Sequence, residues 1–197
     1  MKKKIAYQGR PGAYSHLVCK KAFPNYEPVS CDSFEEVFKR TESRETEISL
    51  VPIENSQAGR VADIHNLLPM SNLVITGEYF HKVSHHLLGC PGSSLMSIKT
   101  AESHLHALAQ CKDFLINNKI KPIISADTAG AAEEISKVKD ITRAAIASEL
   151  AAKIYDLTIL KSDIEDATHN TTRFLFMKES FEEERVKNTS YITSFIF

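Results

Sequence analysis

Residues 5–15 read IAYQGRPGAYS and combine a short strand, a turn and the start of a helix. Ile5–Tyr7 is an apolar run of strand length, and the glycines and proline that follow it are typical of a tight turn. Ser15 is the expected N-cap of a helix over Ser15–Phe23, because its hydroxyl can accept a backbone N–H. A strand that turns directly into a helix is the repeating unit of an α/β fold.

The same alternation of apolar runs and helical periodicity continues along the chain, which predicts an α/β fold throughout. Ser33-x-x-Glu36 is a capping box that starts a second helix, and Ser103 and Asp127 are expected to cap two more. The expected strands are Ile5–Tyr7, Ile48–Val51, Leu73–Thr76, Val83–Leu88, Ile98–Thr100, Ile123–Ser125, Ala144–Ala147, Ile159–Leu160 and Phe174–Met177.

The composition indicates an ordinary globular protein without an affinity for polyanions. Lys and Arg number 24 against 25 Asp and Glu, so no global field favours nucleic acid or an anionic membrane. No apolar run approaches the roughly 18 residues that crossing a bilayer requires. Lys2–Lys4 is not followed by the hydrophobic region of a signal peptide, so we expect a cytoplasmic protein.

The cysteines and histidines form no recognisable metal or disulfide pattern. The 4 cysteines lie far apart and include no C-x-x-C pair, which favours free thiols in a reducing compartment. His85-His86 and His104-x-His106 lack the spacing that places two ligands on one helix face. We therefore expect no metal site.

Polar residues are concentrated where strands end and helices begin, which is where α/β sheets bind ligands. Taken alone, each of these corners is ambiguous: Gly9-x-x-Gly12 is also an ordinary tight turn, and Ser103 and Asp127 are also simple caps. Together they predict a cleft rich in hydroxyls and backbone amides, suited to a small carboxylate. The corners are residues 8–15, 54–59, 102–104, 127–128, 148–149 and 170–173.

The corners together resemble the ordered motifs of the prephenate dehydratase family over residues 5 to 177. They are Tyr7-Gln8-Gly9-x-Pro11-Gly12-Ala13-Tyr14-Ser15, Val51-Pro52-Ile53-Glu54-Asn55-Ser56-x-x-Gly59, Ser103-His104-x-x-Ala107-Leu108-Ala109-Gln110-Cys111, Asp127-Thr128-Ala129-x-Ala131-Ala132 and Asn170-Thr171-Thr172-Arg173-Phe174. The resemblance implies two α/β lobes similar to those of periplasmic binding proteins, with the active site in the cleft between them. Residues 1–80 with 170–180 would form one lobe, and residues 81–169 the other.

The resemblance also implies an activity, the cofactor-free conversion of prephenate to phenylpyruvate, and a homodimer or larger homo-oligomer. In it Thr172 is the essential residue, which we interpret as a hydrogen-bond donor to the leaving hydroxyl. Asn55, Ser103, Gln110 and Thr128 would hold the substrate's carboxylates and hydroxyl.

Two further residues of the motifs have two interpretations each. Arg173 either neutralises the pyruvyl carboxylate of the substrate or forms a structural salt bridge. Glu54 either orients Asn55, with a possible part in proton traffic, or stabilises its lobe.

Two alternatives to a prephenate dehydratase stay open. An arogenate dehydratase has overlapping motifs, and the implied fold also serves non-catalytic modules that bind small carboxylates. Residues 181–197 are expected to be a linker and the remnant first strand of an ACT regulatory domain, so we expect no inhibition by phenylalanine.

Overall fold

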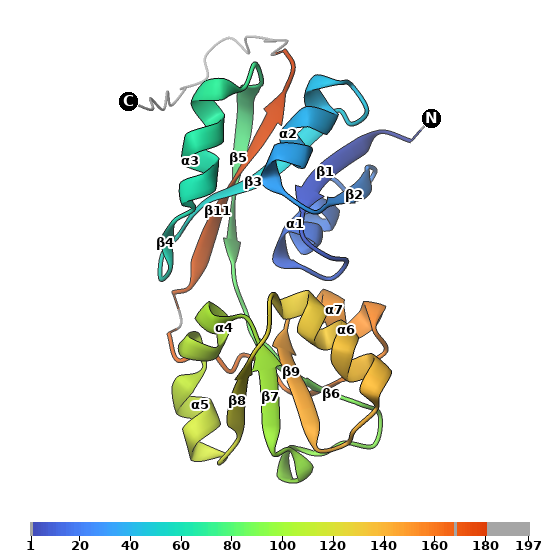
Figure 1. Ribbon diagram of the computed structural model, residues 1–197, viewed down its shortest axis with the longest axis vertical. Coiled ribbons are helices and arrows are strands. Elements are labelled where there is room, and N and C mark those ends of the chain that lie inside the picture. Colours follow the sequence, from blue (N-terminus) through green and yellow to red (C-terminus); the bar gives the residue numbers. More distant parts are fainter. Residues whose placement is uncertain (1, 168, 181–197) are drawn as a thin grey trace, which may run out of the picture.

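The computed structural model describes residues 2–167 and 169–180, which form two α/β lobes stacked along the long axis of the molecule (Figure 1). Each lobe has its own sheet, and helices pack against both sheets. The predicted two-lobed α/β fold is confirmed. The predicted remnant strand within residues 181–197 lies outside the described residues.

The first sheet contains the N-terminal strands and one strand from the end of the chain. Its order is β2-β1-β3-β11-β5, with β4 paired to β3, and β11 runs antiparallel to both of its neighbours. Its strands are β1 (Lys4–Gln8), β2 (Glu27–Cys31), β3 (Ile48–Asn55), β4 (Gly59–Arg60), β5 (Val74–Lys82) and β11 (Thr171–Lys178).

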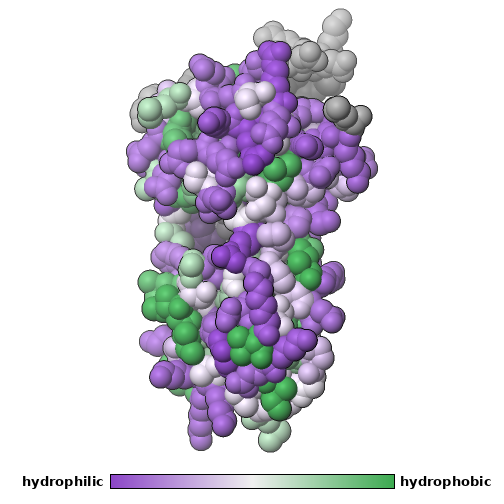
Figure 2. Space-filling model, turned by 45° about the vertical axis from the view of Figure 1, so that its right-hand side comes forward, coloured by the Kyte–Doolittle hydropathy of each residue, from purple (hydrophilic) through white to green (hydrophobic). Residues whose placement is uncertain are grey.

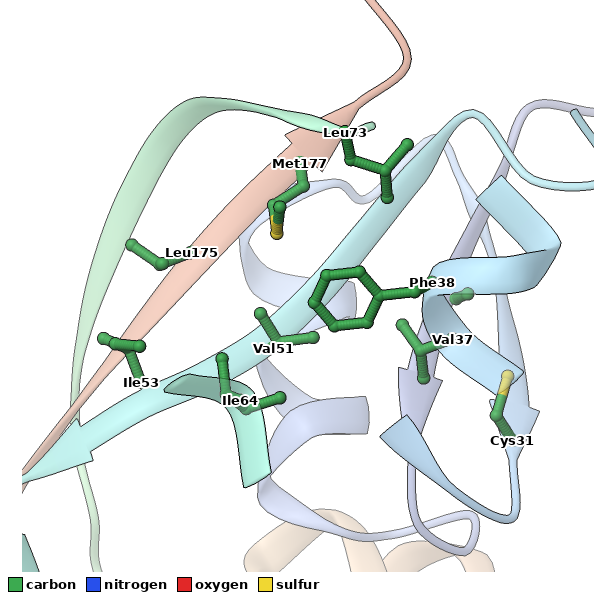
Figure 3. Packing of buried hydrophobic residues seen from close by; sticks show 10 residues of the cluster. Cys31, Val37, Phe38, Val51, Ile53, Ile64, Leu73, Leu175 and Met177 are labelled. Carbon is green, nitrogen blue, oxygen red and sulfur yellow. The ribbon is translucent and has the colours of Figure 1, made fainter. Parts of the chain in front are cut away.

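Helices cover both faces of this sheet. One buried cluster lies under α2 and α3, where Phe38 and Ile64 pack on Val51 and Met177 (Figure 3). The cluster on the other face includes Tyr7, Val18 and Phe174 and lies under α1. The helices of this lobe are α1 (Tyr14–Ala22), α2 (Phe34–Glu42), α3 (Ala62–Leu67) and the 3-10 turn Leu68–Met70.

The second sheet has the order β10-β6-β9-β7-β8, with β7 parallel to both β8 and β9. Small alanine side chains at its centre, such as Ala144 and Ala145, allow the helices to pack closely. The elements of this lobe are β6 (His86–Gly89), the 3-10 turn Leu95–Ser97, β7 (Thr100–Ser103), α4 (Leu105–Gln110), α5 (Lys112–Asn117), β8 (Lys121–Ile124), α6 (Thr128–Val138), β9 (Arg143–Ala147), α7 (Glu149–Ile154) and β10 (Thr158–Lys161).

The turn after β1 rests on the second lobe. Ser148 Oγ donates to the carbonyl of Gly12 at 2.6 Å, and the Tyr155 hydroxyl donates to the carbonyl of Pro11 at 2.8 Å. Gly12 has a φ of 93° and lies so close to α7 that a Cβ there would be 2.9 Å from Ala151 Cα. Only glycine satisfies both demands, so this position fixes how closely the lobes approach.

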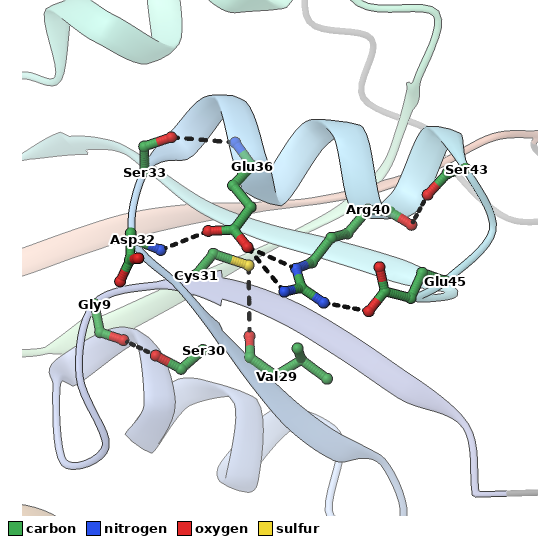
Figure 4. A network of polar contacts seen from close by, with 10 residues as sticks. All are labelled: Gly9, Val29, Ser30, Cys31, Asp32, Ser33, Glu36, Arg40, Ser43 and Glu45. Carbon is green, nitrogen blue, oxygen red and sulfur yellow. Dashed lines mark hydrogen bonds and ion pairs between the residues drawn. The ribbon is translucent and has the colours of Figure 1, made fainter.

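The capping box at Ser33 is confirmed in its main feature. Ser33 Oγ accepts the backbone N–H of Glu36 at 3.2 Å (Figure 4). The Glu36 carboxylate, however, accepts the N–H of Asp32 rather than that of Ser33, at 2.8 Å, and also binds Arg40. These contacts fix the turn that follows β2.

Three local expectations near the cavity between the lobes are wrong. The N-cap of α1 is Ala13, without a side-chain cap, rather than Ser15. Ser103 ends strand β7, and His104 is the N-cap of the following helix. The expected strand Val83–Leu88 is instead β6 from His86, because residues 83–85 cross between the lobes.

Hydrophilic residues cover most of the face shown in Figure 2, and hydrophobic residues on it form small separate patches. Within residues 2–167 and 169–180, no helix combines the length and the apolar character that crossing a membrane demands. The four cysteines are buried and free.

Gly12→Ala is expected to destabilise the protein more than Gly92→Ala. Both glycines have positive φ, near 90°, so each substitution costs about 1–2 kcal/mol for the left-handed backbone. Nothing lies within 4 Å of a Cβ at Gly92, whereas at Gly12 the Ala151 backbone must move as well. Urea unfolding of both variants measures the difference, and equal losses would contradict a tight lobe contact at Gly12.

Candidate active site

Polar residues from both lobes line a cavity of about 560 Å³. The first lobe contributes the segments after β1, β2 and β3 and the start of β11, and the second contributes α4 and the start of α6. Ligands bind at such strand ends because helix N-termini and free backbone groups converge there. The predicted site residues that line this cavity are Asn55, Gln110, Thr128 and Thr172.

A larger hollow of about 1130 Å³ lies elsewhere in the first lobe, where β1 begins and β11 ends. Charged residues such as Lys4, Glu47 and Lys178 line it. It includes none of the predicted site residues, so we take the cavity between the lobes as the candidate site.

Thr172 and Asn55 lie directly opposite each other in the antiparallel pair of β11 and β3. Asn55 Nδ2 donates to Thr172 Oγ1 at 2.9 Å and to Asn170 Oδ1 at 2.8 Å. Asn55 Oδ1 accepts the backbone N–H groups of Gln57 and Ala58. These two acceptor bonds fix the amide, so its nitrogen faces Thr172. Because Thr172 Oγ1 accepts from Asn55, its own proton is free for another acceptor.

Gln110 connects this group to the second lobe. Gln110 Oε1 accepts from Asn170 Nδ2 at 2.9 Å and contacts His85 Nε2 at 2.8 Å. The other ring nitrogen of His85 lies 2.7 Å from the hydroxyl of Tyr14, in the first lobe. Burial lowers the pKa of His85, so the ring is neutral at neutral pH. Because Gln110 Oε1 is an acceptor, Nε2 is the nitrogen that donates, and the Tyr14 hydroxyl lies within hydrogen-bond distance of both Nδ1 and the carbonyl of Ser84. The amide nitrogen of Gln110 then has no acceptor among the described residues.

Thr128 lies at the cavity, whereas Ser103 is buried away from it. Thr128 begins α6 and lines the cavity, next to Asp127, whose carboxylate accepts the N–H of Gly130 at 2.6 Å. Ser103 is fully buried, is not among the residues that line the cavity, and donates to the carbonyl of Ile146 at 2.6 Å. Asp127 is therefore the cap that the sequence predicted, while Ser103 holds strand β7 to β9.

Arg173 and Glu54 do not line the cavity. Successive side chains of a strand point to opposite faces of the sheet, so Arg173 lies on the face away from Thr172. Its guanidinium binds Glu78 at 2.7 Å and Glu54 at 3.2 Å. The salt bridge of the second interpretation of Arg173 is thus present. The geometry likewise gives no support to substrate contact by Glu54.

Sequence reasoning assigned no role to three residues of the hydrogen-bond network. Tyr14 and Asn170 both belong to the quoted motifs. Tyr14 follows the turn at Gly12 and Asn170 lies two residues before Thr172, and these positions could have indicated a role in the site. His85 was placed in a strand, and only the crossing between the lobes brings it to Gln110.

The charged side chains among the described lining residues are Arg10, Asp32 and Asp127. His104 also lines the cavity, and burial lowers its pKa. The first turn of α1 has no side-chain cap, and Ala13, Tyr14 and Ser15 at this helix start line the cavity, so uncapped backbone N–H groups are available there to an anion. Within the described ranges, no group of three or more His, Cys, Asp or Glu side chains could hold a metal ion.

Two curated relatives resemble the chain over most of its length. It is 44% identical over 170 residues to a bifunctional N-acyl-homoserine lactone acylase/prephenate dehydratase of Komagataeibacter europaeus, covering 86% of this chain and 60% of that protein. It is 41% identical to arogenate dehydratase/prephenate dehydratase 1, chloroplastic, of Arabidopsis thaliana, covering 100% of this chain and 50% of that protein. The chain thus spans between half and two thirds of the length of these relatives.

The fold agrees with these relatives. The solved structure of the prephenate dehydratase from Staphylococcus aureus superposes with a TM-score of 0.79 at 26% identity, covering 91% of this chain and 67% of that one. The family model for prephenate dehydratase matches residues 5–181. That range includes every residue that lines the cavity between the lobes, and on this match the chain belongs to the prephenate dehydratase family.

Proposed function

We propose that this chain is a carbon–oxygen lyase that converts prephenate to phenylpyruvate, carbon dioxide and water. The observation that carries the proposal is the hydrogen bond from Asn55 to Thr172 Oγ1, which leaves the Thr172 proton free to donate within the cavity. The chain spans only part of its relatives, so the activity of a whole protein is included in the proposal.

The reaction needs a donor on the leaving oxygen and no external electron acceptor. The bond from the ring to its carboxylate breaks, its electron pair forms the aromatic ring, and the ring hydroxyl leaves. One proton is taken up, so the products are carbon dioxide, water and phenylpyruvate. Aromatisation drives the reaction, and a donor placed where negative charge develops lowers the barrier. We propose that Thr172 is that donor.

The remaining polar groups are suited to holding the substrate. The Gln110 amide nitrogen, the Thr128 hydroxyl and the first turn of α1 offer neutral donors to carboxylates. Asn55 serves the same purpose indirectly, by holding Thr172 and Asn170. Ser103 supports the wall of the site in this proposal rather than binding substrate, because its hydroxyl donates to Ile146.

A second candidate function is the dehydration of arogenate, the amino analogue of prephenate. The name of the Arabidopsis thaliana relative includes both activities. The two substrates differ by an ammonium in place of the keto oxygen. Incubating the purified chain with each substrate, and measuring phenylpyruvate or phenylalanine, decides between the two activities. If neither phenylpyruvate nor phenylalanine is formed, both proposed activities are contradicted.

We propose three further properties from the family. The chain acts in the cytoplasm, although the Arabidopsis thaliana relative is named as chloroplastic. It assembles as a homodimer or larger homo-oligomer. Residues 1–80 with 170–180 form one lobe and residues 81–169 the other, although strand β5 of the first sheet continues to Lys82.

Thr172→Ala is expected to lower kcat about 10²–10³-fold, the typical effect of removing one donor to a developing charge. Thr172→Ser is expected to keep part of the activity, because the hydroxyl survives. Thr171→Ala is the matched control, since its side chain is absent from the lining of the cavity. A Thr172→Ala enzyme within threefold of the parent would contradict the assignment.

Asn55→Ala is expected to weaken both the product affinity and kcat. The change removes the donor to Thr172 and leaves the N–H groups of Gln57 and Ala58 without their acceptor. The loss of such a bond is worth about 1–3 kcal/mol. Calorimetric titration with phenylpyruvate measures the affinity, and exposed Asn72→Ala is the control. Equal affinities in the two variants would rule out a role for Asn55 in the site.

A further inference from the structure

Arg10 is the only lysine or arginine among the described residues that line the cavity between the lobes. It occupies the position between Gly9 and Pro11 in the turn after β1, which the quoted motif leaves open. The resemblance to the family does not specify this residue. Its chemistry is nevertheless suited to a carboxylate ligand, because a guanidinium can donate two parallel hydrogen bonds to the two carboxylate oxygens.

In this structure the Arg10 side chain bridges the two lobes. Nη1 binds Glu133 Oε2 at 2.6 Å, and Nε lies 3.6 Å from Asp127 Oδ2. Both carboxylates belong to the start and first half of α6 in the second lobe. The Arg10 side chain is 57% exposed, and ion pairs between exposed groups contribute little to stability.

Both partners of Arg10 keep another bond when Arg10 turns away. Glu133 Oε1 binds Lys137 at 2.6 Å, so its charge stays compensated. Asp127 Oδ1 accepts the N–H of Gly130 and remains the cap of α6. A carboxylate in the cavity can therefore replace Glu133 on the guanidinium without leaving a buried charge unpaired.

The proposed reaction indicates which of the two substrate carboxylates binds Arg10. This inference therefore rests on the proposed function. The ring carboxylate loses its charge as carbon dioxide leaves. A cation on that group would stabilise the ground state more than the transition state and would slow the reaction. The carboxylate of the side chain keeps its charge throughout, so a cation there binds substrate without opposing the chemistry.

We propose that Arg10 binds the carboxylate that the product retains and makes the site prefer prephenate over arogenate. In arogenate an ammonium stands on the carbon next to that carboxylate, within a few ångströms of the guanidinium, and like charges repel. Without Arg10, the carboxylates of Asp127 and Glu133 repel the dianionic prephenate and attract the ammonium. Arg10 is thus a specificity-determining residue of this cavity.

The test compares kcat/KM for both substrates in the parent chain and in three variants. Arg10→Gln is expected to lower kcat/KM for prephenate about tenfold to a hundredfold, mainly through KM, the usual loss for a hydrogen bond to a charged group. The value for arogenate falls much less, so the ratio of the two kcat/KM values shifts several-fold or more toward arogenate. Glu133→Gln, which removes a competitor for Arg10, leaves KM for prephenate unchanged or lower. Arg44→Gln, which breaks a remote ion pair with Glu179, leaves kcat/KM unchanged for both substrates.

Two outcomes would overturn the inference while leaving the proposed function intact. One is an equal fold-loss of kcat/KM for prephenate and arogenate in Arg10→Gln, which would mean that Arg10 only joins the lobes. The other is a Glu133→Gln enzyme that loses as much activity on prephenate as Arg10→Gln does. A parent chain that converts neither substrate would instead overturn the proposed function, and this inference with it.

Discussion

The antiparallel pairing of β11 with β3 is the constraint on which the site depends. It places Thr172 opposite Asn55 and sets Arg173 opposite Glu54 on the other face. Because side chains alternate along a strand, a slip of one residue would turn Thr172 out of the cavity and bring Arg173 into it. The strand comes from the end of the described chain, so the chain passes through the second lobe before it returns to complete the first sheet.

That return path also explains why the two lobes share one hydrogen-bond network. Asn170 precedes β11 and lies between Asn55 in one lobe and Gln110 in the other. His85, on the outgoing crossing, binds Gln110 and Tyr14 from opposite lobes. A hydrogen-bond network that joins both lobes in this way is rigid, because breaking any one of its bonds leaves a buried polar group unpaired. The cavity therefore has a defined shape without a ligand, and within this network Thr172 and Gln110 each keep a free donor.

Much of this could be predicted from sequence, because it is encoded locally. Strand–turn–helix corners and the caps at Ser33 and Asp127 follow from neighbouring residues, and both caps are present. Strand β2 was missed, since Pro28 within a five-residue segment argues against a strand, yet β2 is an edge strand, where proline is tolerated. The burial of Ser103 and the position of His85 depend on contacts between distant segments, and no local pattern reports these.

The reaction proposed for the cavity does not require a strong acid, and the groups that hold Thr172 are neutral and do not make its hydroxyl more acidic. A threonine hydroxyl is a weak acid, so its contribution is a hydrogen bond held in one place while charge builds on the leaving oxygen. Asn55 holds Thr172, and the backbone N–H groups of Gln57 and Ala58 hold Asn55. Each step of this support is a neutral group attached to β3, β11 or the turn between β3 and β4. The position of the donor is thus set by the hydrogen-bond ladder of the sheet, and ionised side chains are left for recognising the charge of the substrate.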